Sequence, residues 1–223
     1  MPASTLLEPA HPFRLDKIAY TLYNREYMKT YDMSLFTKKI YDSSLQLFSV
    51  KTFADLFELN KSSSFYKIIN RLIVSDVLVK VERDKYLLVN YTGGEFALAH
   101  FLYEPSYISF ESALSYYGIL SQFPHEVTSA TLKQTRSKKL TGKQFGYYHL
   151  KKELFWGYIK ENNYLIAEPE KALLDQVYLS TKGIKKSHLD EYDLSLIDKK
   201  KLQLYRQKFT QTKQFSKTLN ILI

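Results

Sequence analysis

The stretch 49–89 constrains the fold of this chain more than any other, because two helical patterns are followed there by two β-rich runs. Residues 49–60 form a short helical pattern, and residues 61–75 carry one apolar stripe with helical spacing. Residues 77–89 predict two strands around the polar tip Glu82-Arg83-Asp84-Lys85. A helix, a tight turn, a second helix and a hairpin follow one another in this order in a winged helix-turn-helix, so we expect that fold here.

The second helix of this stretch has the composition of a DNA-recognition helix. No acidic residue occurs between Asn60 and Ser75. Hydroxyl side chains at its start can cap the helix and leave backbone amides pointing at phosphate oxygens. Basic side chains at the hairpin tip would reach the neighbouring DNA backbone. The residues that we expect to contact DNA are Lys61, Ser62, Ser63, Ser64, Tyr66, Lys67 and Arg71 from the helix, and Arg83 and Lys85 from the hairpin.

The excess of positive charge is concentrated at the end of the chain. The protein has 223 residues, with 32 Lys and Arg against 23 Asp and Glu, so its formal charge is +9. Residues 1–90 contribute 13 − 10 = +3, residues 91–180 contribute 9 − 9 = 0, and residues 181–223 contribute 10 − 4 = +6. Positive charge favours a polyanionic partner, but most of the excess lies outside 49–89.

Several classes of protein are excluded or not expected. The absence of cysteine excludes disulfides, thiolate catalysis and Cys-ligated zinc. The start of the chain has no secretory signal pattern, and no run approaches the roughly 18 apolar residues of a membrane helix. We therefore expect a cytoplasmic protein with no membrane partner. The five His have no metal-binding spacing, and no phosphate-binding glycine loop or nucleophile elbow occurs. We expect no enzyme activity, no metal and no cofactor.

The second half predicts a separate α+β domain. Gly93-Gly94 indicates the boundary, which gives a domain over 1–92, with a helical lead-in (patterns from Arg14 and near Ser34), and a domain over 93–223. A helical pattern ends at Gly118 as a glycine C-cap, and another starts at Glu168 with proline in its first turn. Strand patterns cover 126–131, 145–150 and 164–167, and a basic loop covers 133–143. We expect a small, mostly antiparallel sheet followed by a basic helical tail, with Lys171 and Asp175 paired on the surface of their helix.

Four stretches of the chain resemble the AbiE-type antitoxins, the regulator halves of abortive-infection (type IV) toxin–antitoxin pairs. The first is the winged helix at 49–89, and the second is Tyr107-Ile-Ser-Phe-Glu-Ser-Ala-Leu-Ser-Tyr-Tyr-Gly118. The third is Ala130-Thr131 with the basic loop that follows, and the fourth is Ala167-Glu-Pro-Glu-Lys-Ala-Leu-Leu-Asp175. Together they span roughly residues 50–180, and residues after about 185 do not match the family.

The resemblance implies a cytoplasmic bacterial protein with two tasks. Its winged helix would bind operator DNA and repress its own operon. Its second domain would counteract a toxin similar to nucleotidyltransferases, without necessarily forming a stable complex with it. Helix-turn-helix proteins often read paired half-sites, which allows two copies on one operator. Candidate contacts with the toxin or with nucleic acid in the second domain are Lys133, Arg136, Lys138, Lys139, Lys143, Glu170, Lys171 and Asp175.

Other interpretations stay open. The serine run can be only a capping segment, and the hairpin tip can be charged only because it is solvated. The loop 133–143 could extend the DNA footprint, dock on the toxin, bind RNA, or be a solvated connection. The chain as a whole could be a winged-helix regulator whose second domain senses a ligand, with no antitoxin activity, or an interaction module that binds no DNA.

Overall fold

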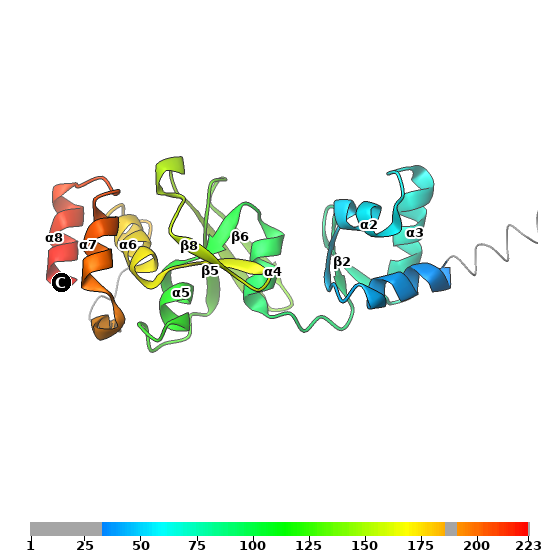
Figure 1. Ribbon diagram of the computed structural model, residues 1–223, viewed down its shortest axis with the longest axis horizontal. Helices are drawn as coiled ribbons and strands as arrows, with labels where there is room; N and C mark the ends of the chain where they lie inside the picture. Colours follow the sequence, from blue (N-terminus) through cyan, green and yellow to red (C-terminus); the bar gives the residue numbers. More distant parts are fainter. Residues whose placement is uncertain (1–32, 186–190, 223) are drawn as a thin grey trace, which may run out of the picture. The chain divides into compact units, whose positions relative to one another are not determined.

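The computed structural model describes residues 33–185 and 191–222, which form an α+β protein with two sheets. This confirms the α+β class that the sequence predicts. The chain divides into two compact units, 1–90 and 91–223, which are described separately below (Figure 1). The helical pattern expected from Arg14 lies outside the described residues.

The described part of the first unit combines three helices with a three-stranded antiparallel sheet of order β1-β3-β2. Its elements are a helix over 33–42, β1 (Leu47–Ser49), α2 (Val50–Phe57), α3 (Ser63–Val74), β2 (Leu78–Glu82) and β3 (Lys85–Leu88). The two helices and the hairpin that the sequence predicts within 49–89 are present. The strand β1 was not predicted, whereas the helix expected near Ser34 is present, with Met33 as its first described residue.

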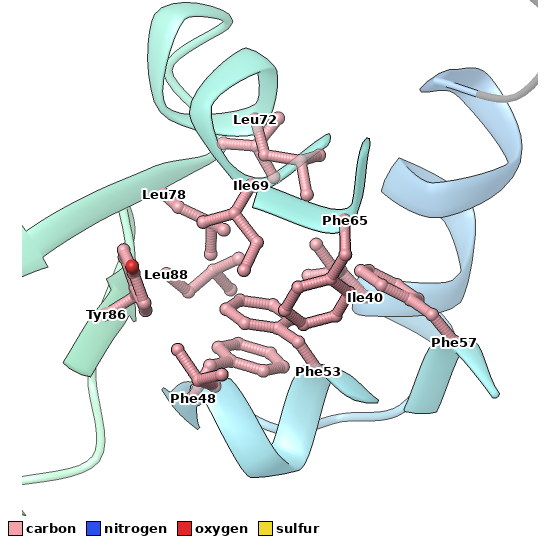
Figure 2. Packing of buried hydrophobic residues seen from close by; sticks show 12 residues of the cluster. Ile40, Phe48, Phe53, Phe57, Phe65, Ile69, Leu72, Leu78, Tyr86 and Leu88 are labelled. Carbon is pink, nitrogen blue, oxygen red and sulfur yellow. The ribbon is translucent and has the colours of Figure 1, made fainter. Parts of the chain in front are cut away.

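The core of the first unit is built around aromatic rings (Figure 2). Phe48 of β1 stacks on Phe53 of α2 with ring centroids 4.9 Å apart, and Phe53 meets Tyr86 of β3 edge-on at 5.6 Å. The buried residues of α3 are Phe65, Ile69 and Leu72. Burial of a side chain of this size stabilises the fold by about 1.5–3 kcal/mol. One face of α3 is therefore fixed on this core, and the opposite face is left to solvent.

The second unit is built on a six-stranded sheet of order β6-β7-β5-β4-β9-β8. Three of its strand pairs are antiparallel, and the pairs β4–β9 and β5–β7 are parallel, so the sheet is mostly antiparallel as predicted. The strands are β4 (Ser106–Ile108), β5 (Glu126–Thr131), β6 (Arg136–Leu140), β7 (Lys143–His149), β8 (Tyr158–Glu161) and β9 (Tyr164–Ala167). The helices are α4 (Glu95–Leu102), α5 (Phe110–Tyr116), α6 (Pro169–Ser180), α7 (Lys199–Arg206) and α8 (Lys213–Leu222), with short 3₁₀ turns at Lys152–Leu154 and Leu194–Leu196.

Most of the predicted elements of the second unit are confirmed. The three predicted strands correspond to β5, β7 and β9. The helix α5 ends at Gly118, whose φ of 75° is left-handed and costs glycine little, and Ile119 N donates back to Leu114 O at 2.9 Å. Proline occupies the first position of α6, where its missing N–H has no intrahelical partner to lose.

The basic segment 133–143 is not the loop that the sequence predicted. Residues Arg136–Leu140 form β6, which pairs antiparallel with β7 across the two-residue turn Thr141-Gly142. Lysine has a low intrinsic preference for strands, which hid β6 in the sequence. Because β6 is the edge of the sheet, its charged side chains can extend into water without disturbing the pairing.

The helix α6 is surrounded on all sides. It contacts α5, α7 and α8, and every residue from Glu170 to Leu179 is buried. The tail is mostly helical as predicted, and its two helices pack on α6. Phe209, which follows α7, stacks on Phe215 of α8 at 5.6 Å. The polar residues of α6 consequently lie in the interior of the second unit.

Candidate nucleic-acid interface

The start of α3 is defined by Ser62. This residue has an extended backbone, and its hydroxyl accepts a hydrogen bond from Phe65 N at 3.3 Å. A side chain in this position replaces one of the hydrogen bonds that the first turn of a helix cannot make. The neighbouring Ser63 and Ser64 remain exposed at the helix start, as does Lys61 before it.

The outward face of α3 carries every other residue that the sequence predicted for DNA contact on this helix. Tyr66 is 43% exposed, and Lys67 and Arg71, which are about one turn apart, are also exposed. Asn70 is exposed beside them. The ring of Tyr66 is held edge-on against Phe65, with centroids 5.4 Å apart, so its position is coupled to the core. This face combines hydroxyl, amide and basic groups without a carboxylate, which suits phosphate and base contacts.

The hairpin tip is anchored to α2 and is less basic than the helix. Val50 N donates to Asp84 O at 3.1 Å, which ties the tip to the first residue of α2. Arg83 is 96% exposed, and its Nε lies 3.8 Å from the Asp84 carboxylate. Lys85 is partly buried. Because Glu82 and Asp84 balance the charges of Arg83 and Lys85, the tip presents one exposed guanidinium group and no positive patch. An exposed ion pair such as Arg83–Asp84 is worth at most about 1 kcal/mol.

The five basic residues of 133–143 do not form one cluster. Lys133 and Lys138 both lie over the ring of Tyr103, at 5.2 and 4.9 Å from its centroid, and Lys138 Nζ donates to Leu102 O at 2.8 Å. Lys143 forms an ion pair with Glu95 at 2.8 Å. The remaining two, Arg136 and Lys139, are exposed on β6. Since adjacent residues of a strand point to opposite faces, this segment distributes its charges over both sides of the sheet edge.

The residues of α6 that the sequence predicted as partner contacts are buried. Lys171 and Asp175 form the ion pair that their spacing predicts, but both side chains are 0% exposed, so the predicted surface position is wrong. Glu170 is also buried, with 3% of its surface exposed. The physical reason is that α5, α7 and α8 cover α6, which no pattern within α6 itself reveals. These three residues have no direct access to a macromolecular partner.

The buried ion pair belongs to a hydrogen-bonded cluster with β4. Asp175 accepts hydrogen bonds from the hydroxyls of Tyr107 and Ser109, each at 2.9 Å, and Lys171 donates to the Tyr107 hydroxyl at 2.8 Å. The Lys171 ammonium group also lies 5.3 Å from the ring of Trp156. Sequence reasoning did not find Tyr107 and Ser109 as partners, although their i, i+2 spacing puts both on one side of an extended segment.

The pKa values of the cluster are set mainly by burial. Burial raises the pKa of Asp175, against the opposing effects of the Lys171 charge and of the hydrogen bonds that Asp175 accepts. Burial lowers the pKa of Lys171, and Asp175 opposes that shift. Burial and the nearby Asp175 charge both raise the pKa of the Tyr107 hydroxyl. Gly157, with φ 72°, lies directly over Lys171, since a Cβ at that position would be 3.0 Å from Lys171 Cγ. The cluster therefore links α6 to β4 in a closed interior.

Two further carboxylates of α6 and its cap bind α7. Glu168 accepts from Lys201 Nζ at 2.8 Å and from the Tyr205 hydroxyl at 2.5 Å. Glu170 accepts from Asp198 N at 3.0 Å and lies 3.3 Å from Lys201 Nζ. Burial alone would raise the pKa of Glu168, but the hydrogen bonds from Lys201 and Tyr205 and the Lys201 charge lower it below its ordinary value. The side chains of the run Glu168–Asp175 therefore link α6 to both β4 and α7.

The described part of the chain contains neither a metal-binding cluster nor a membrane-spanning helix. Within 33–185 and 191–222, no group of three or more His, Asp or Glu is arranged to hold a metal ion. No helix in that part of the chain combines the length and the apolar character that crossing a membrane requires. No protein-family model matches the chain, and no curated protein matches it in sequence.

Proposed function

We propose that the first unit is a winged helix-turn-helix that binds operator DNA and represses transcription of its own operon. The observation that carries this proposal is the outward face of α3, which is exposed, free of carboxylates and capped by Ser62. The order α2, α3 and the hairpin β2–β3, together with the third strand β1, supports the winged-helix interpretation. In this proposal α3 enters the major groove and Arg83 reaches a neighbouring phosphate.

The DNA-binding proposal is tested with Lys67→Ala/Arg71→Ala in the full chain. We expect its affinity for the DNA upstream of its own gene to fall, and the salt dependence of binding to weaken by about 2 in slope if each side chain contacts one phosphate. The matched control is Lys38→Ala/Lys39→Ala, which removes the same charge from the helix over 33–42. Equal affinities and salt slopes for the α3 variant and the wild type would contradict the assignment of α3 as the recognition helix.

For the second unit, we propose antitoxin activity against a toxin similar to nucleotidyltransferases. Its support is the resemblance of 107–118 and 167–175 to the AbiE-type antitoxins. The buried positions of Lys171 and Asp175 favour a structural role for the second of these stretches, so the surface that acts on the toxin lies elsewhere. The proposal predicts that a neighbouring gene encodes a nucleotidyltransferase-like toxin, and that co-expression of this chain restores the growth which that toxin suppresses. Failure to restore growth would contradict the antitoxin proposal.

A ligand-sensing regulator is a second candidate, favoured by one hollow in the second unit. This hollow has a volume of about 190 Å³, and its lining includes Glu111, Phe123, His125, Glu191 and Tyr192. A pocket of this size could hold only a small ligand, since typical small-molecule sites measure roughly 300–1,000 Å³. Restored growth in the co-expression experiment would favour the antitoxin over this alternative.

A further inference from the structure

The helices α7 and α8 lie in a segment whose charged residues are all basic. Residues 199–222 contain no Asp or Glu. Their seven basic residues are Lys199, Lys200, Lys201, Arg206, Lys208, Lys213 and Lys217. Five of them, Lys199, Lys200, Lys208, Lys213 and Lys217, are exposed, and we call these five the tail surface. Neither the DNA-binding proposal for α3 nor the antitoxin proposal accounts for it.

Most of this charge is not used to hold the fold together. Lys201 is paired with Glu168 and Glu170. Arg206 is hydrogen-bonded to the neutral side chains of Gln211 and Asn220 at 3.2 Å each. Among the residues that the structure describes, Lys199, Lys200, Lys213 and Lys217 contact no carboxylate. Lys208 Nζ lies over the ring of Trp156, 4.3 Å from its centroid. The tail surface therefore combines four exposed ammonium groups that have no carboxylate partner with one that lies against an aromatic ring.

The positions of these lysines oppose the stability of the two helices. Lys199 and Lys200 lie in the first turn of α7, where the helix dipole disfavours positive charge. Asp198 offsets part of this effect, since its side chain caps Lys200 N at 2.8 Å. Lys213 and Lys217 are four residues apart on α8, a spacing at which like charges destabilise a helix by a few tenths of a kcal/mol. The exposed lysines take no part in the attachment of α7 and α8. Both helices are held by buried apolar residues, and α7 also by the contacts of Glu168 with Lys201 and Tyr205. The buried apolar residues are Leu202, Phe209, Phe215 and Leu219.

Several of the other exposed residues of this segment suit a phosphate backbone, although the apolar Leu204 and Ile221 are exposed as well. The polar ones include Gln203, Gln207, Thr210, Gln211 and Gln214. Amide and hydroxyl groups of this kind supply many of the hydrogen bonds that proteins make to phosphate and sugar, while lysine supplies the charge. A surface without carboxylates also avoids repulsion of a polyanion at close range.

We infer that the tail surface binds the phosphate backbone of duplex DNA, so that the chain contacts DNA through both of its units. This inference rests on the DNA-binding function proposed for α3. Because the two units are parts of one chain, contact by α3 raises the effective concentration of DNA near the tail surface, and each contact strengthens the other. The tail surface adds affinity and salt dependence without reading sequence, because backbone contacts carry no base information.

The test compares three full-length variants with the wild type on one DNA duplex in a salt series, and repeats the measurement with an RNA duplex. Lys200→Gln/Lys213→Gln/Lys217→Gln removes three charges from the tail surface. Lys151→Gln/Lys152→Gln/Lys160→Gln removes three exposed charges elsewhere in the second unit. The third variant is Lys67→Ala/Arg71→Ala. We expect the tail variant to lose about 2 to 3 in salt slope and roughly 50- to 500-fold in affinity at about 0.1 M salt, whereas its lysine control keeps the wild-type slope.

The outcomes separate this inference from the proposal for α3. If the tail variant binds like the wild type while the α3 variant is weakened, the inference is wrong and the α3 proposal stands. If only the tail variant is weakened, the α3 proposal is wrong and the tail surface stands as a DNA-binding site. Equal losses in the tail variant and its lysine control would show a general effect of net charge and overturn the inference. Loss of affinity for duplex RNA alone, with DNA affinity unchanged, would overturn the assignment to DNA.

Discussion

The helices α3 and α6 have the same length of 12 residues, but they use their polar side chains in opposite ways. α3 buries one apolar face and presents its polar residues to solvent. α6 is covered on all sides and buries Lys171 and Asp175 along with its apolar residues. The difference shows that a polar residue in a helical pattern is accessible to a partner only when the helix leaves that side exposed to solvent.

Partner binding and folding stability are expected to depend on different helices. Substitutions on the outward face of α3 remove no packing and leave no buried group without a partner, so their cost in folding is small. Substitutions in the polar cluster of α6 leave a charge in an interior that cannot solvate it. We therefore expect variants of α6 to unfold the second unit, and variants of the outward face of α3 to change only what the protein binds.

The largest effect is expected for Asp175→Ala. This change leaves the Lys171 ammonium group buried without its counter-charge and takes the shared acceptor from Tyr107 and Ser109. Breaking a buried ion pair from one side typically costs about 3–5 kcal/mol in the free energy of unfolding. The single tryptophan, Trp156, lies beside Lys171, so its fluorescence during urea denaturation reports on this part of the second unit.

A double substitution tests whether the cost comes from the unpaired charge. Lys171→Met/Asp175→Leu removes both charges and keeps apolar volume, so it is expected to be more stable than Asp175→Ala. Lys139→Ala on the exposed edge strand is the control and is expected to change the free energy of unfolding by less than about 0.5 kcal/mol. If Asp175→Ala were as stable as Lys139→Ala, Asp175 would not be the buried counter-charge of Lys171. Substitution of polar residues in α6 would then cost no more folding free energy than substitution on the exposed face of α3.

The sequence was sufficient to predict α3 and its two faces because the residues that determine them lie within the helix itself. One apolar stripe, one capping serine and an acid-free remainder predict the helix, its buried face and its exposed face together. For α6, the spacing of Lys171 and Asp175 correctly predicted their pairing, but their burial depends on α5, α7 and α8, which are distant in sequence. The strand β6 was missed for a related reason, since its position at the sheet edge permits residues that local strand preferences disfavour.

A smaller effect is expected for Ser62→Ala at the start of α3. The hydroxyl of Ser62 is the acceptor for Phe65 N, and removal of an N-cap hydroxyl typically costs about 1 kcal/mol. Ser63→Ala, one residue along and exposed, is the matched control and is expected to stay within about 0.5 kcal/mol of the wild type. The measurement is the urea midpoint by circular dichroism together with hydrogen exchange of the α3 amides. Equal effects of the two substitutions would mean that Ser62 does not cap α3.

The start of α6 shows the opposite arrangement. Glu168 occupies the N-cap position of α6, but its side chain makes no capping hydrogen bond to that helix. Its carboxylate binds Lys201 and Tyr205 of α7 instead. One cap thus stabilises its own helix, and the other attaches a neighbouring helix. The two caps are expected to respond differently to pH, because only Glu168 titrates.

The smallest effect is expected for Glu168→Gln. The amide retains hydrogen-bonding capacity toward Tyr205 but loses the charge that attracts Lys201, a cost of less than about 1 kcal/mol at neutral pH for a partly exposed pair. Because the pKa of Glu168 is lowered below 4.5 in the folded protein, its stabilising contribution is complete above pH 4.5 and is lost as the pH falls through the lowered pKa. The difference in unfolding free energy between wild type and Glu168→Gln should therefore shrink on acidification. Ser62→Ala supplies the comparison, since its cost should not follow the titration of a carboxylate in this way. A difference for Glu168→Gln that stayed constant as the pH fell well below 4.5 would mean that the Glu168 charge does not hold α7 on α6.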